Sequence, residues 1–175
     1  MRTLVTYFSN TGNTRKIAEA IYSALPRFKR LLNISEVESL ADYSLIFVGF
    51  PVHAFCPVNQ AKEFLIKYAS GRNVALFATM SLTAVPASEY LQDYYKRTIS
   101  NCKAIADNSN LLGIFDCPGE LSKHTATDLL NSENKLLQMF GGMRDLTLGF
   151  PNDQNTSDAK KFAREIFYNF LEKYS

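Results

Sequence analysis

Short apolar runs alternate with amphipathic stretches along most of this sequence, and this alternation is the feature that most restricts the fold. Four of the runs are rich in Val, Ile, Leu and Phe and do not alternate cleanly with polar residues. Strands covered on both faces have this composition, as in the parallel sheets of α/β proteins. The four runs are Thr3–Phe8, Ser44–Phe50, Asn73–Thr79 and Leu111–Asp116, and a weaker fifth is Leu31–Ser35.

Apolar residues at helical spacing occupy the segments between these runs. Pro26 stops the first such stretch, and Gly71 is a candidate C-terminal cap for the second. Strands that alternate with helices predict right-handed crossovers and a doubly wound parallel sheet with helices on both faces, in the strand order 2-1-3-4-5. The helical stretches are Ile17–Leu25, Ala61–Tyr68, Tyr90–Ile99 and Phe162–Leu171.

One segment breaks the alternation of strands and helices. The 175 residues fit a single domain over 1–175, with an insertion around 118–156 between the fifth strand and the last helix. Within the insertion, Thr125–Phe140 has helical spacing and Gly141-Gly142 would end the helix. We expect Leu146–Phe150 to form a short extra strand.

Charge and cysteine content restrict the partners and the compartment. The formal net charge is +2, and the basic run of Arg27, Lys29 and Arg30 is expected to be a solvated helix end or loop, so no nucleic-acid partner is predicted. Three cysteines without a CxxC pair indicate neither a disulfide framework nor a zinc site. The N-terminus is unlike a signal peptide, and no run approaches the ~20 apolar residues of a membrane span. We therefore expect a cytoplasmic protein without an integral membrane segment.

The loop after the first strand carries the strongest chemical signal. Ligands of open α/β sheets bind beyond the carboxyl ends of the strands, where the strand order reverses. A helix N-terminus there offers free N–H groups, hydroxyls can donate to phosphate oxygens, and glycine lets the backbone approach closely. Without GK[ST] or GxGxxG, the loop predicts a phosphate monoester site; a plain polar turn is the alternative. The loop residues are Ser9, Asn10, Thr11, Gly12, Asn13 and Thr14.

This loop resembles the phosphate-binding pattern of the flavodoxin family, [S/T]-x-T-G-x-T, at every specified position. Gly49–Pro57 is similar to the family's G-x-P-x-x-x-x-x-P segment after the third strand. The tail is similar to standalone flavodoxin-like proteins in Cys117–Ser122, Gly149–Asp153 and Asp158–Ala163.

The resemblance implies a noncovalent site for flavin mononucleotide (FMN), with Ser9 through Thr14 around the phosphate. The two sides of the isoalloxazine ring would be bordered by Pro51, Val52, His53, Ala54 and Phe55, and by Thr79, Met80, Ser81, Leu82 and Thr83.

The chain also departs from many flavodoxins, because it has no Trp and is not strongly acidic. Met80 or Leu82 would pack on the ring in place of an aromatic residue, or that face would be open. His53 would either stabilise the anionic reduced flavin when protonated or be an ordinary loop residue, in which case His53→Phe retains FMN. Phe55 would stack on the ring or close onto the core.

Other reactive groups are weaker candidates. Cys56 and Cys117 lie near the predicted carboxyl-end loops, either as reactive thiols or as ordinary cysteines. Glu120 and His124 have i, i+4 spacing without a third ligand, so no metal is expected, and no catalytic residue is predicted.

Three functions remain open at this point. The first is electron transfer through FMN between a reductase and a partner enzyme. The second is an FMN-dependent NAD(P)H/quinone-type oxidoreductase or an enzyme like the menaquinone-linked protoporphyrinogen oxidases, with the insertion over the flavin or against an apolar acceptor. The third is a flavin-less binding module that kept the fold.

Overall fold

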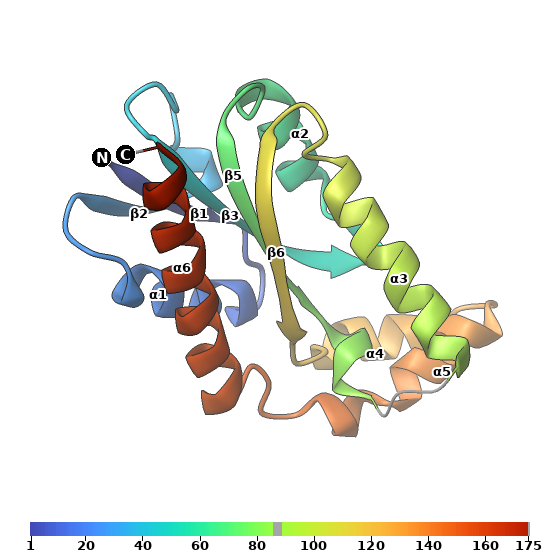
Figure 1. Ribbon diagram of the computed structural model, residues 1–175. Helices are drawn as coiled ribbons and strands as arrows, with labels where there is room; N and C mark the ends of the chain where they lie inside the picture. The colour runs from blue at the N-terminus through green and yellow to red at the C-terminus, as the bar shows by residue number, and fades with distance from the viewer. Residues whose placement is uncertain (86–88, 175) are drawn as a thin grey trace.

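The computed structural model describes residues 1–85 and 89–174, and their side chains except those of residues 89 and 90. Strands and helices alternate along the chain (Figure 1). The strands are β1 (Thr3–Tyr7), β2 (Lys29–Asn33), β3 (Leu45–His53), β4 (Cys56–Pro57), β5 (Asn73–Met80) and β6 (Asn110–Pro118). The helices are α1 (Asn13–Ala24), α2 (Asn59–Tyr68), α3 (Glu89–Ala104), α4 (Lys123–Leu130), α5 (Lys135–Gly142) and α6 (Asp153–Tyr174), with 3-10 turns η1 (Ile34–Glu36), η2 (Ser81–Ala84) and η3 (Arg144–Thr147).

The sheet confirms the predicted topology. Its order is β2-β1-β3-β5-β6, with parallel pairing along this path and the two-residue β4 paired antiparallel to the end of β3. Without β4, this is the expected order 2-1-3-4-5. The order reverses between β1 and β3, so the switch point lies beyond the carboxyl ends of these two strands.

Side chains of β3 alternate between two cores, one on each face of the sheet. Leu45 and Phe47 pack with α1 and α6, whereas Ile46 and Val48 pack with α2 and α3. All four are fully buried, which explains why this strand is an unbroken apolar run. Figure 1 shows α1 and α6 side by side on one face, with α2 and α3 on the other.

The 118–156 segment lies between β6 and α6 and differs from the expected insertion in two details. The single helix expected over Thr125–Phe140 is two helices, because Asn131–Asn134 separates α4 from α5 and the Asn134 side chain accepts the Leu136 N–H as a cap. The strand expected over Leu146–Phe150 is wrong. Leu146 belongs to η3, Gly149 has φ +81°, and the exposed Leu146 and Leu148 side chains give no buried face to pair.

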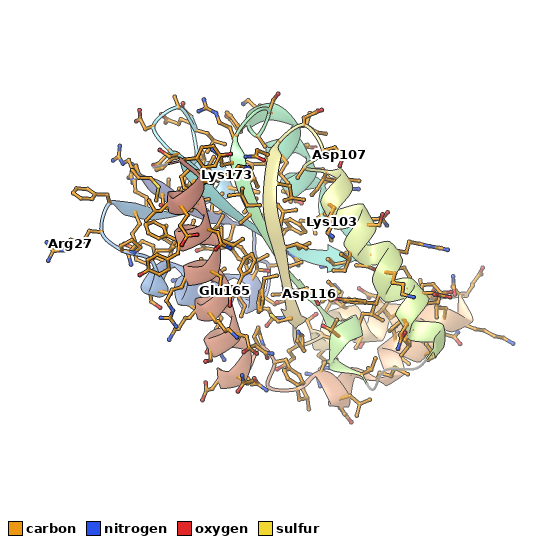
Figure 2. All side chains as sticks on the ribbon, in the orientation of Figure 1. Arg27, Lys103, Asp107, Asp116, Glu165 and Lys173 are labelled. Atoms are coloured by element: carbon orange, nitrogen blue, oxygen red, sulfur yellow. The ribbon has the colours of Figure 1, made fainter. Side chains whose placement is uncertain are left out.

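Two further expectations are corrected at the second strand. β2 begins two residues earlier than expected and stops at Asn33, whose side chain caps η1. Lys29 is not simply solvated, since its ammonium donates to the Tyr22 and Leu25 carbonyls at the end of α1. Arg27 is exposed and projects away from the body (Figure 2).

Within the described residues, no helix is long and apolar enough to cross a membrane.

Candidate functional site

The loop between β1 and α1 is folded by Gly12. This residue has φ +93° and precedes the first helical residue, and its N–H donates to the Ser9 hydroxyl oxygen at 3.1 Å. A Cβ at Gly12 would meet no neighbour within 4 Å, so the backbone angle rather than space requires glycine here.

This loop leaves a group of backbone donors open at the start of α1. In residues 1–85 and 89–174, no protein acceptor pairs with the N–H groups of Thr11, Asn13 and Thr14. The first turn of α1 holds no acidic residue, and Asn10, Thr11 and Gly12 are exposed. Free N–H groups at the amino end of a helix form an anion-binding site. This arrangement fits the phosphate of a monoester.

Two hydrogen bonds connect this loop to the carboxyl ends of β5 and β6. The hydroxyl oxygens of Thr14 and Thr79 lie 2.8 Å apart and are buried, and Asn13 Nδ2 donates to the Glu120 carbonyl at 2.9 Å. Thr14 is only 1% exposed. Its hydroxyl thus connects two loops, whereas the exposed Thr11 hydroxyl is open to a ligand.

A polar cleft of about 70 Å³ lies between these loops. Most of the expected phosphate-side and ring-side residues meet in it, together with residues after β6. Its lining is Ser9, Asn10, Thr11, Asn13, Thr14, Pro51, Val52, His53, Thr79, Met80, Ser81, Gly119, Glu120, Leu121, Ser122 and Thr125.

An apolar cavity of about 270 Å³ continues from the polar cleft. Three of the expected site residues, Ala54, Phe55 and Leu82, line this cavity and not the polar cleft. The two spaces share the residues Val52, His53, Met80, Ser81, Leu121 and Thr125. One continuous cleft therefore runs from a polar, donor-rich end to an apolar end.

Two expected site residues line neither space. Gly12 lies in the phosphate-side loop but contributes to the wall of neither space. Thr83 lines a neighbouring cavity together with Leu91 and Tyr95. The Thr83 hydroxyl donates to the Met80 carbonyl at 3.3 Å, which holds the turn after β5.

A tight hairpin between β3 and β4 forms one wall of the apolar cavity. Its two turn residues, Ala54 and Phe55, have φ +48° and +64° and connect the paired His53 and Cys56. Two consecutive left-handed residues match a type I′ turn, which favours Asn and Gly rather than these side chains. Asn101 Nδ2 supports the turn by donating to the Phe55 carbonyl at 3.0 Å.

The remaining candidates take different positions. The His53 side chain is exposed, while Met80 and Leu82 are buried in the cavity wall. Phe55 stacks on Tyr94, with ring centroids 4.8 Å apart. Cys117 is buried, and burial raises the pKa of its thiol to about 12, so it stays protonated.

Sequence reasoning missed the residues contributed by the segment after β6. Leu121 and Thr125 line both spaces, and Leu129, Leu137 and Phe140 line the apolar cavity. The signal was available, because β6 also ends at the switch-point edge. The sequence predicted individual ligand-binding residues only in the loops after the first, third and fourth strands, and, as one alternative, it placed the insertion over the flavin without naming residues.

Glu120 connects the beginning of this segment to its end, close before α6. Its carboxylate accepts the Gly149 N–H at 3.1 Å and lies 3.4 Å from the Arg144 guanidinium, and its own N–H donates to the Phe150 carbonyl. His124 is exposed and pairs with Asp128 instead, so Glu120 and His124 do not form a joint site. No group of three or more His, Cys, Asp or Glu side chains within the described residues could hold a metal ion.

The model of the flavodoxin domain matches residues 4–164 of this sequence. The chain belongs to the flavodoxin domain family. This flavodoxin domain is 27% identical over 177 residues to the flavodoxin-like domain-containing protein BilS of Clostridioides difficile (strain CD3), covering 95% of this chain and 96% of that protein.

Solved flavodoxins share the fold. A flavodoxin from the domain Archaea is similar with a TM-score of 0.57 and 13% identity, over 98% of this chain and 99% of the other. Flavodoxin 2 from Bacillus cereus is similar with a TM-score of 0.53 and 18% identity, over 99% of this chain and all (100%) of the other.

FMN is the cofactor of flavodoxin domains and binds at the β1/β3 switch point. The cleft of this flavodoxin domain lies at that place and fits both ends of the molecule. Free N–H groups and the Thr11 hydroxyl suit the phosphate, and the adjoining apolar cavity suits a flat ring system.

Proposed function

We propose that this protein is an FMN-binding electron carrier of the cytoplasm, which takes electrons from a reductase and passes them to a partner enzyme. The observation that carries the proposal is the continuous cleft at the switch point, with unpaired N–H groups at one end and apolar side chains at the other. Three free cysteines are consistent with a reducing compartment.

The protein's own residues bind and orient the cofactor. Ser9 through Thr14 would hold the phosphate through backbone N–H groups and hydroxyls, without a lysine. Pro51–Phe55 would border one side of the ring and Thr79–Leu82 the other, while Thr83 holds the turn through its hydrogen bond to Met80. The Thr14–Thr79 hydrogen bond connects the phosphate loop to one of the two ring loops. When bound, the flavin supplies the one- or two-electron chemistry, while the protein supplies position and electrostatic surroundings.

Absorbance of the purified protein, followed by titration of the flavin-free chain with FMN, tests the binding step. A flavin spectrum with saturable FMN binding is expected. A colourless chain that gains no flavin spectrum would contradict the proposal and favour a binding module that lost the cofactor.

Turnover measurements distinguish a carrier from an oxidoreductase. The FMN-loaded protein alone should show no steady consumption of NAD(P)H with a quinone, yet it should be reduced when a flavodoxin reductase is added. Sustained turnover without a second protein would contradict the carrier assignment and support the oxidoreductase.

A further inference from the structure

The segment between β6 and α6 closes the far side of the apolar cavity. Leu129 of α4 and Leu137 and Phe140 of α5 line it, together with residues of the hairpin and of the turn after β5. Phe140 is only 8% exposed although it lies in a short helix near the surface of the fold. Figure 1 shows α4 and α5 at the end of the sheet where the β6 arrow points, which is the switch-point end.

An aromatic contact fixes α5 against the hairpin. The Phe55 ring lies 5.7 Å from the Phe140 ring at an interplanar angle of 67°, and its other neighbour is Tyr94 of α3 at 4.8 Å. Edge and offset contacts of this kind are favourable beyond simple burial. Phe55 therefore joins α3, the hairpin and α5 into one wall.

The occupant of this cavity follows from its continuity with the polar cleft. Six residues line both spaces, and the apolar lining begins where the phosphate-side donors end. A ligand held by a phosphate at the polar end would place its ring system toward this cavity, because the cavity is the larger of the two spaces and is lined mainly by apolar side chains.

We propose that Leu137 and Phe140 are ring-binding residues, so that α5 covers the isoalloxazine of FMN in a chain that lacks the tryptophan of many flavodoxins. The proposal rests on the proposed FMN binding. The side chains of Leu137 and Phe140 would exclude water from one side of the isoalloxazine ring. They would take the place that a tryptophan side chain stacked on the ring has in many flavodoxins.

The test measures the dissociation constants of riboflavin and FMN for wild type, Leu137→Ala and Leu146→Ala. Leu146 lies in the same segment but is 50% exposed and lines neither space, so it is the matched control. Leu137→Ala should weaken both flavins by a similar factor of about ten, because the ring is common to both and a lost apolar contact of this size corresponds to about 1.4 kcal/mol. Leu146→Ala should leave both constants unchanged.

Acrylamide quenching of the bound flavin's fluorescence gives a second readout. The quenching constant should rise in Leu137→Ala and in Phe140→Leu, which keeps an apolar side chain in place and guards against unfolding of α5. Thermal unfolding of the flavin-free variants checks that they fold.

The outcomes separate this inference from the proposed function. Failure of the wild type to bind FMN would overturn both. FMN binding by wild type together with unchanged affinities and quenching in Leu137→Ala and Phe140→Leu would overturn only the role of α5. Weakening of FMN without weakening of riboflavin would also overturn it, since the effect would then belong to the phosphate end.

Discussion

Gly49, in the middle of β3, leaves the space that a phenyl ring of the neighbouring strand occupies. A Cβ at this position would lie 1.9 Å from Cε2 of Phe77, which is fully buried between the sheet and the α1–α6 layer. The contact is inside a close-packed core, so the ring cannot move aside without disturbing its other neighbours.

Gly49→Ala is therefore expected to lower the free energy of unfolding by about 3 kcal/mol. Urea unfolding of the flavin-free protein measures this change. Gly142→Ala is the control, since a Cβ there meets nothing within 4 Å, and its effect should stay below about 1 kcal/mol. Equal effects of the two substitutions would show that the Phe77 ring does not depend on Gly49.

Asp116 is a partly buried carboxyl group of β6, labelled in Figure 2. Burial raises its pKa above 3.8, and the hydrogen bond from the Tyr95 hydroxyl at 2.9 Å lowers it in part. The folded state therefore holds this proton more tightly than the unfolded state. The resulting stabilisation is complete below pH 3.8 and is lost as the pH rises through the raised pKa of the folded state.

Asp116→Asn, which keeps an oxygen acceptor for Tyr95, should raise the melting temperature at pH 7. The increase should shrink as the pH falls toward 3.8, where the wild-type carboxyl is also neutral. Calorimetry across this range, with the exposed Asp107→Asn as the control, measures the difference. If Asp116→Asn raised the melting temperature by the same amount at pH 7 and near pH 3.8, the ionised carboxylate of Asp116 would not destabilise the folded state.

For the loop after β1, the sequence pattern predicted where the loop lies, but not which of its hydroxyl groups is open to a ligand. The loop lies at the switch point as expected, but Thr14 is buried against Thr79, a partner 65 positions away in the sequence. A sequence pattern specifies residue types along one segment. Which hydroxyl stays open depends on the loop that packs over it. Here that leaves Thr11, and also Ser9, whose hydroxyl oxygen accepts the Gly12 N–H but which still lines the cleft.

The β3–β4 hairpin shows how an element can be held in a costly conformation by its surroundings. A left-handed residue other than glycine costs roughly 1–2 kcal/mol, and the turn has two, Ala54 and Phe55. Packing of Phe55 on Tyr94 and Phe140 and the hydrogen bond from Asn101 offset this cost. Such strain persists where the neighbouring structure determines the conformation.

Ala54→Gly should raise the free energy of unfolding by about 0.5–1 kcal/mol, because glycine adopts positive φ without a steric cost. Denaturant unfolding measures this change. Ala104→Gly, at the exposed end of α3, should instead destabilise the chain by a similar amount. A loss of stability in Ala54→Gly would mean that the turn is not strained at this position.

Strands and helices of the sheet layers were predictable because each carries its own local signal: an unbroken apolar run for a strand, and apolar residues at helical spacing for a helix. The elements between β6 and α6 were harder to predict from the sequence. Thr125–Phe140 has continuous helical spacing, yet the Asn131–Asn134 segment caps two helices instead of continuing one. Leu146–Phe150 is apolar enough for a strand, but a strand also needs a partner edge, which local sequence does not report.

For the whole molecule, alternating strands and helices sufficed to predict the layers and the sheet order, and a cleft lies at the switch point where the ligand is expected. The wall formed by α4 and α5 could not be located from spacing, because its position depends on long-range contacts. The most important of these are the Glu120 contacts to Gly149 and Arg144 and the Phe55–Phe140 ring pair.

The central claim is that the loop after β1 holds the phosphate of FMN, and the most direct test compares FMN with riboflavin on wild type and Thr11→Val. Thr127→Val, an exposed threonine of α4, is the control. Isothermal titration should show tighter binding of FMN than of riboflavin to wild type and to Thr127→Val, with the difference reduced about tenfold in Thr11→Val and riboflavin affinity unchanged. Equal affinities of wild type for the two flavins, or equal weakening of both by Thr11→Val, would contradict the account.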